Sequence, residues 1–171
     1  MPTTRTDRSA PRAALRCGAA AVLALGFLGA TAASAAGLDP HSYAEPERFV
    51  VRHASLDLRA DFDARRLEGS IELKLERRAP DADELVLDSR DLEIRRVALV
   101  AADGSLTELR YAAGPADRVL GQPIRIAMPT EAPAEPRVRI EYATGTASRA
   151  LQWLAPEQTA GRSRPFVYTK S

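Results

Sequence analysis

The chain has 171 residues, of which 45% are hydrophobic, and its 24 basic and 23 acidic side chains give a formal net charge of +1. This length suits one domain, at roughly 100–200 residues per domain. Basic pairs such as Arg65-Arg66 and Arg77-Arg78 stand beside acidic residues. The charge pattern therefore indicates a solvated mixed surface and argues against a phosphate-binding stripe for nucleic acid.

The first 35 residues have the order of a secretory signal. Four arginines and one aspartate precede the apolar run 18–30, and small residues then place a cleavage site after Ala35. A membrane-spanning helix would need about 20 apolar residues. Cys17 precedes the apolar run, whereas an acylated cysteine would end it, so no stable membrane anchor is expected. The sequence predicts a cleavable helical signal over residues 1–35 and export to the periplasm or the medium.

Cleavage after Ala35 changes the charge and the cysteine content of the mature chain. The signal removes four arginines and Asp7, which leaves 20 basic and 22 acidic side chains and a formal charge of −2. Because Cys17 is the only cysteine, the mature chain uses no disulfide or thiolate. Residues 36–48 are expected to form a linker and the start of the mature chain, and residues 49–171 a single β domain.

An antiparallel hairpin is predicted at the start of this domain. After His53, Leu56 and Leu58 alternate with polar residues, which predicts a half-buried strand. A polar turn over residues 63–66 leads into a second alternating run, 67–76, with one apolar and one wet face. Two such runs joined by a short polar link favour a hairpin.

Shorter strands are expected along the rest of the chain. The apolar runs predict a strand over 85–87, one or two strands over 92–99, and further strands over 106–111, 124–128 and 137–142. Asp103-Gly104 predicts a turn between two of them, since glycine takes a positive φ without steric cost. No run after residue 35 has a sustained helical period. Such short strands, separated by turns, predict an all-β sandwich or barrel of mostly antiparallel strands.

The sequence predicts no metal site. The two histidines, His41 and His53, are twelve residues apart, and neither belongs to an H-E-x-x-H motif. His41 falls in the expected linker and His53 at the start of a strand, where each is better explained as a solvated or capping group. Asp61-Phe-Asp63 lacks the further oxygen ligands and the glycine of a calcium loop. These acids are therefore expected at the end of a hairpin.

Catalytic side chains are not predicted either. No G-x-S-x-G elbow surrounds a serine. Glu72 and Glu76 fall on one face of a strand near Lys74 and Arg77, which predicts a surface ladder rather than the paired acids of a glycosidase.

The most distinctive stretch is LQWLAPEQTAG, residues 151–161, which holds Trp153, the only tryptophan. By itself a lone tryptophan indicates packing. The longer segment EYATGTASRALQWLAPEQTAGRSRPFVYTKS, residues 141–171, closely resembles the end of the N-terminal β domain in zinc aminopeptidases of the aminopeptidase N and leukotriene hydrolase family, in the leukotriene hydrolase-like branch. The resemblance gives a structural role to eight residues: Leu151, Gln152, Trp153, Leu154, Pro156, Gln158, Thr159 and Gly161.

Three earlier segments support the resemblance. Residues 39–77 are similar to the opening of the family's sheet, LVLDSRDLEIRRV at 85–97 to its next segment, and LGQPIRI at 120–126 to a third. The resemblance thus covers about residues 39–169, with its motifs in the family's order. It implies a saddle-like β-sandwich.

In that family the β domain packs on a catalytic domain whose H-E-x-x-H motif and distal glutamate hold zinc, and whose G-x-M-E-N motif holds the amino terminus of the peptide. This sequence has neither motif, so no cofactor is expected in this chain, and zinc only in a full-length parent. The family pattern calls for glutamine where Lys170 stands, and a second glutamine would follow Ser171. No substrate-binding residue is therefore expected here.

Two functions remain open at this point. The first is a non-catalytic fragment of an exported zinc aminopeptidase, inactive alone, with the catalytic domain as its partner in cis or as a split product. Truncation, a frameshift and a split gene would each produce it, and peptide would be bound only with that domain. The second is a free-standing secreted β-sandwich that binds a partner or carbohydrate. The fragment hypothesis predicts an uncovered apolar surface around Leu151 to Val167, because surface meant for another domain is left in water.

Overall fold

Ten strands and one short 3-10 turn make up the computed structural model, which describes residues 39–146 and 148–169. The strands are β1 (Phe49–Asp61), β2 (Arg66–Arg77), β3 (Glu84–Ser89), β4 (Leu92–Val100), β5 (Leu106–Glu108), β6 (Tyr111–Ala113), β7 (Gln122–Ala127), β8 (Arg137–Thr144), β9 (Leu151–Leu154) and β10 (Phe166–Thr169); the turn is η1 (Pro156–Gln158). The predicted signal, including Cys17 and Ala35, lies outside the described residues, as does Lys170. The prediction of an all-β fold is confirmed.

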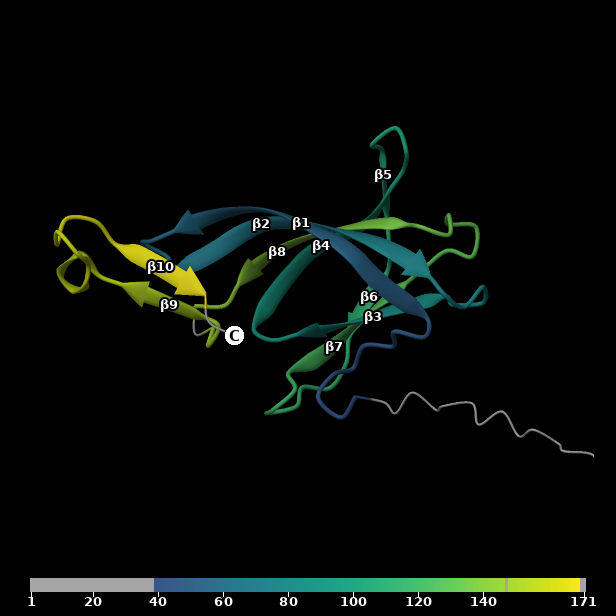
Figure 1. The fold of residues 1–171 in the computed structure, drawn as a ribbon, viewed down its shortest axis with the longest axis horizontal. Coiled ribbons are helices and arrows are strands. Elements are labelled where there is room, and N and C mark those ends of the chain that lie inside the picture. Colours follow the sequence, from purple (N-terminus) through teal and green to yellow (C-terminus); the bar gives the residue numbers. More distant parts are fainter. Residues whose placement is uncertain (1–38, 147, 170–171) are drawn as a thin grey trace, which may run out of the picture. The chain divides into compact units, whose positions relative to one another are not determined.

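Three antiparallel sheets organise these strands (Figure 1). The largest has the order β1-β2-β8-β4-β5, the second β3-β7-β6, and the third is the hairpin β10-β9. β8 lies between β2 and β4, so the two halves of the large sheet meet on a strand that comes late in the chain. The one or two strands predicted over 92–99 are the single strand β4, with an irregularity between Ile94 and Arg96. The prediction of one strand over 106–111 is wrong, because the chain passes from one sheet to the other there and forms β5 and β6.

The predicted β1–β2 hairpin is present, and its register places Asp61 opposite Arg66 and Phe49 opposite Arg77. Its turn is closed by the Asp61 carboxylate, which accepts a hydrogen bond from the Ala64 N–H at 2.8 Å. Gly69 has a φ of +151° and lies against the backbone of Asp57 and Leu58. The hairpin thus needs glycine at this point, because a side chain would meet the neighbouring strand.

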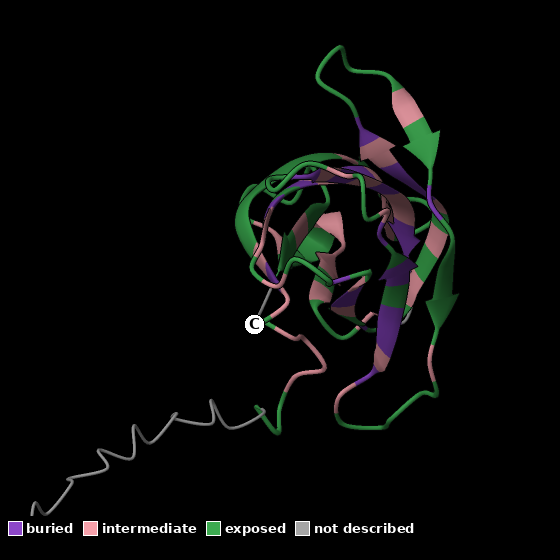
Figure 2. Cartoon of the chain, turned by 90° about the vertical axis from the view of Figure 1, so that its right-hand side faces the viewer, coloured by how far each residue is buried: buried purple, intermediate pink, exposed green. Residues whose placement is uncertain are grey.

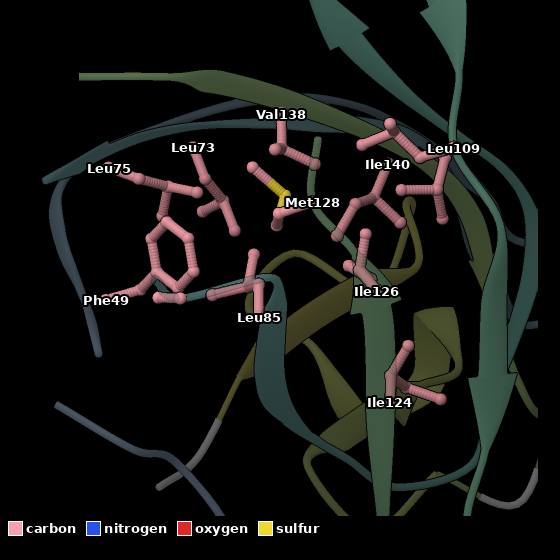
Figure 3. Packing of buried hydrophobic residues seen from close by; sticks show 12 residues of the cluster. Phe49, Leu73, Leu75, Leu85, Leu109, Ile124, Ile126, Met128, Val138 and Ile140 are labelled. Atoms are coloured by element: carbon pink, nitrogen blue, oxygen red, sulfur yellow. The ribbon is translucent and has the colours of Figure 1, made fainter. Parts of the chain in front are cut away.

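The hydrophobic core lies between the five-stranded and the three-stranded sheets (Figure 3). It is contributed by the inward faces of strands that alternate apolar and polar residues. The buried residues gather where these sheets face each other, and exposed residues line the outer strands (Figure 2). The cluster comprises Phe49, Leu73, Leu75, Ala82, Leu85, Val97, Leu109, Ile124, Ile126, Met128, Val138 and Ile140.

Arginine and glutamate pair across neighbouring strands on the other face of the large sheet. Glu72 accepts a hydrogen bond from Arg137 of β8 at 2.8 Å, and Glu76 accepts one from Arg52 of β1 at 2.6 Å. The ladder expected at these glutamates is present, although its cations come from neighbouring strands rather than from Lys74 or Arg77. The hydrogen bond and the charge of Arg59 hold the pKa of Glu68 below its ordinary value.

The prediction of a half-buried β1 is wrong. Leu56 is 61% exposed and Val51 44% exposed, whereas Leu73 and Leu75 of β2 are buried as expected. The reason is topological, because β1 is the edge of its sheet. Alternation of apolar residues shows which side chains share a face of the strand. Whether that face is buried depends on whether the opposing sheet extends over it.

The segment before β1 contacts β3. The Asp88 carboxylate accepts hydrogen bonds from the Ser42 hydroxyl at 2.7 Å and from the Tyr43 N–H at 2.8 Å. Arg48 forms an ion pair with Asp83 at 2.8 Å. Within 39–146 and 148–169, the structure contains no helix with the length and apolar character needed to cross a membrane.

Candidate interaction surface

The hairpin β9–β10 carries the distinctive stretch of the sequence. Its register places Trp153 opposite Val167 and Gln152 opposite Tyr168. Side chains alternate between the two sides of a strand, so Trp153 and Val167 share one face, and Gln152 and Tyr168 share the other. The sequence analysis did not predict this hairpin as a pair of strands.

The connection between these strands is held by its own side chains. The Gln158 amide oxygen accepts a hydrogen bond from the Ala155 N–H at 3.0 Å. The Thr159 hydroxyl lies 2.8 Å from the Pro156 carbonyl and 2.9 Å from the Arg164 carbonyl. Gly161 follows with a φ of +81°. These contacts give Pro156, Gln158, Thr159 and Gly161 positions within one folded loop.

Trp153 connects the hairpin to the β1–β2 turn. Its ring meets the ring of Phe62 edge to face, with the centroids 5.4 Å apart, an arrangement that aromatic pairs favour. Beside this pair lies an open cleft of about 290 Å³, lined also by Arg65, Leu154 and Pro156. The aromatic pair is therefore the wall of a surface hollow and does not belong to the central core.

The other face of the hairpin leaves aromatic side chains in water. Phe166 is 54% exposed and Tyr168 is 39% exposed, and the Tyr168 hydroxyl hydrogen-bonds to the Gln152 amide oxygen. Large aromatic residues are enriched where proteins contact partners, since they bury much area at low entropic cost. We call Gln152, Leu154, Phe166 and Tyr168 the hairpin surface.

A second apolar region is a cleft between the five-stranded and the three-stranded sheets. It has a volume of about 250 Å³ and mostly aliphatic walls, which include Ile71 and Ile140. Tyr142 also lines it, and burial raises the pKa of the Tyr142 phenol. Asp88 and Ser89 are the polar residues among its lining, and walls that are otherwise apolar suit the burial of another apolar surface.

The residues considered for metal binding are not brought together. The backbone N–H of His41 donates to Asp39 at 2.8 Å, and the His53 Nε2 lies 3.2 Å from the Ser55 hydroxyl. In residues 39–146 and 148–169 no three His, Cys, Asp or Glu side chains converge. The described residues therefore do not fit a zinc site. The Asp61 carboxylate instead accepts a hydrogen bond from the Ala64 N–H in the β1–β2 turn.

The residue composition of β9 and β10 favours strands, although their hydrophobic periodicity did not predict them. The segments LQWL and FVYT are rich in aromatic and branched residues, which favour strands. Each is only four residues long, with Pro156 two residues after the first and Pro165 directly before the second. Short runs of this kind are ambiguous until their partner strand is known.

The curated relatives that the chain matches are peptidases and hydrolases. Leukotriene A-4 hydrolase of Xenopus laevis is 34% identical over 134 residues, which are 77% of this chain and 21% of that protein. Leucine aminopeptidase 2 of Pyricularia oryzae is 33% identical over 139 residues, or 80% of this chain and 22% of that protein. No family model matches the chain.

Solved structures agree with these relatives. Yeast LTA4 hydrolase in complex with bestatin superposes with a TM-score of 0.69 and 26% identity, over 80% of this chain and 21% of that one. Native leukotriene A4 hydrolase of Saccharomyces cerevisiae gives 0.68 and 25%, over the same shares. The chain thus spans about a fifth of the length of the relatives it matches. Sequence and fold together confirm that this β domain belongs to the leukotriene A-4 hydrolase and leucine aminopeptidase 2 family.

Proposed function

We propose that this chain is the non-catalytic, saddle-like N-terminal β domain of an exported zinc aminopeptidase, and that it works only together with a catalytic polypeptide. Its role is to present a folded surface against which that polypeptide packs. The single observation that carries the proposal is the match of 134 residues to about a fifth of leukotriene A-4 hydrolase. The remaining four-fifths of that relative is the partner we infer, in cis or as a separate product.

The hairpin surface is the proposed contact with this partner. It combines exposed Phe166 and Tyr168 with a rigid loop, and it adjoins the cleft beside Trp153. Exposed aromatic groups on a preformed backbone lose little entropy when they are covered. The surface thus agrees with the uncovered apolar region expected around Leu151 to Val167.

The reaction would belong to the partner. Zinc held by an H-E-x-x-H motif and a distal glutamate would supply a bound water of lowered pKa as nucleophile. This chain would contribute no ligand to the metal, and removal of N-terminal residues from peptides would require both polypeptides.

Activity and metal content test the proposal directly. The purified full chain is incubated with Zn²⁺ and an aminoacyl 4-nitroanilide, and zinc is then quantified after gel filtration. We expect neither turnover above buffer nor stoichiometric zinc. Turnover that survives repurification and disappears with a chelator would refute the proposal.

The coding sequence beyond Ser171 tests for the partner. We expect it, or a neighbouring gene, to encode H-E-x-x-H and G-x-M-E-N in a polypeptide that lacks its own β domain, and co-expression to yield a complex. If that genome encodes no such polypeptide, the free-standing secreted binding module is the better description.

Export is tested separately from the partner. Expression in a bacterium with a periplasm, followed by N-terminal sequencing of the periplasmic fraction, is expected to give a chain that begins at Ala36. An intact Met1 terminus found only in the cytosol would contradict the predicted signal.

A further inference from the structure

The outer edge of β1 is a long unpaired strand edge. β1 is 13 residues long and ends the order of its sheet, and no strand of residues 39–146 or 148–169 pairs with its outer side. Most of its side chains are exposed on both faces. Such an edge is a template for another strand, and proteins usually shorten, bulge or cover it.

Hydrogen bonds inside the sheet show which β1 groups face outward. The N–H groups of Leu67 and Leu75 in β2 donate toward the β8 side, to Thr144 and Pro136. Gly69 and Ile71 have the same parity, so their N–H groups also point away from β1. In an antiparallel ladder the two residues of a pair either bond each other or both point away. Leu58 and Leu56, their partners, therefore direct N–H and C=O to the free edge.

We propose that two copies of this chain join edge to edge through β1, antiparallel, with Leu58 of each copy opposite the other on a twofold axis. The ladder then pairs Leu58 with Leu58 and Leu56 with Ala60, and these residues carry the outward backbone groups. The result is one continuous sheet across both copies. Identical edges meet naturally in this way, because a twofold interface brings the same surface patch from each subunit.

Charge complementarity favours this register over the adjacent registers of the β1–β1 pairing. With Leu58 on the axis, Asp57 lies opposite Arg59 of the second copy, and this pair occurs twice. Sliding the strands so that Leu56 faces Leu58 would put Asp57 opposite Asp57, and an axis at Leu56 would put Asp57 opposite the uncharged Ser55. Opposite charges across strands stabilise and like charges destabilise. Asp57 and Arg59 form a non-hydrogen-bonded pair, where the Cα atoms approach to about 4.5 Å.

The ends of β1 limit the alternatives further. The pairing of β1 with β2 is irregular between Val51 and His53, so registers centred before Leu56 run into a bulge. Registers centred at Ala60 run into the turn after Asp61. The pairing of β1 with β2 is regular from His53 to Asp61, and an axis at Leu58 pairs residues 55–61, all of which lie within this regular stretch.

Sedimentation of the full chain over a range of concentrations is the first test. We expect a monomer–dimer equilibrium, and we expect Asp57→Arg to weaken it about tenfold or more, since two attractive pairs become repulsive. The swap Asp57→Arg with Arg59→Asp should restore association. Asp63→Arg makes the same charge change in the turn, outside the paired stretch, and should leave association unchanged. Thermal melts confirm that each variant is folded.

Cross-linking tests the register. In a Cys17→Ser background, Leu58→Cys should give a disulfide-linked dimer, because the paired Cα atoms would be about 5.5 Å apart, within the range for a disulfide. Leu56→Cys should not, since its copies would be separated by roughly 14 Å. A chain that is monomeric at every concentration would overturn the proposal. We expect that result if β1 instead pairs with a strand of another polypeptide. Equal effects of Asp57→Arg and Asp63→Arg, or equal cross-linking at 56 and 58, overturn the proposal as well.

Discussion

Gly69 offers the sharpest test of how the large sheet is built, through the substitution Gly69→Ala. Its φ of +151° is one that residues with a Cβ rarely adopt. Holding alanine at this angle costs about 1–3 kcal/mol. The added Cβ would lie 3.1 Å from the Asp57 carbonyl carbon and the Leu58 Cα, and still closer to the Asp57 carbonyl oxygen. Moving β1 away from this contact adds about 1–3 kcal/mol, the usual cost of overpacking. We expect a loss of at least about 2 kcal/mol in the free energy of unfolding.

Gly104→Ala is the matched control, because Gly104 has a φ of +84° but no atom lies within 4 Å of an added Cβ. It carries the conformational cost without the collision. Urea unfolding followed by circular dichroism measures both variants, and we expect Gly69→Ala to lose about 1–3 kcal/mol more than Gly104→Ala. Equal losses would show that the approach of Gly69 to β1 does not constrain the sheet.

Three further substitutions probe the core, the outer face and the loop. Leu75→Ala removes a side chain that is 1% exposed and should cost about 2–5 kcal/mol, seen as a lower urea midpoint; a loss below about 1 kcal/mol would contradict its place in the core. Arg66, through its hydrogen bond and its charge, holds the pKa of Glu93 below the ordinary value. The pair therefore stabilises the fold above about pH 4.3, and this is lost as the pH falls through the lowered pKa. Accordingly, Glu93→Gln should lower Tm at pH 7 and match the parent in acid, whereas a pH-independent difference would refute the linkage. Thr159→Val removes the hydroxyl between two loop carbonyls; proteolysis near Arg162 should accelerate while Tm changes little, and an unchanged cleavage rate would contradict a role for this hydroxyl.

Local pattern was enough to predict the β1–β2 hairpin and the strands β3, β4, β7 and β8, because alternation depends only on neighbouring residues. Leu73 and Leu75 are buried as the period-two pattern indicates. Leu56 follows the same pattern and is exposed, since burial depends on an opposing sheet whose position is set by residues far along the chain. The pattern therefore predicted burial correctly in β2 and incorrectly in β1.

The candidate interaction surface was only partly foreseeable. The motif around Trp153 identified the segment, but its partner Phe62 lies about ninety residues earlier, directly before the polar turn expected over 63–66. Tertiary contacts of this kind leave no trace in local spacing. The pairing of Phe166 with Leu154 was hidden for a related reason, since both strands are only four residues long and prolines lie in the connection between them.

The central place of β8 affects when this domain can fold. β8 is the strand that links β2 to β4, and it ends at Thr144. A growing chain that has not yet released residues 137–144 from the ribosome holds two separate pieces of the sheet with nothing to join them. Pairings between residues far apart in sequence form slowly, because a long loop must close before they bring any stabilisation. Assembly of the large sheet therefore waits until residues 137–144 are available, even if the earlier strands have already formed their own pairs.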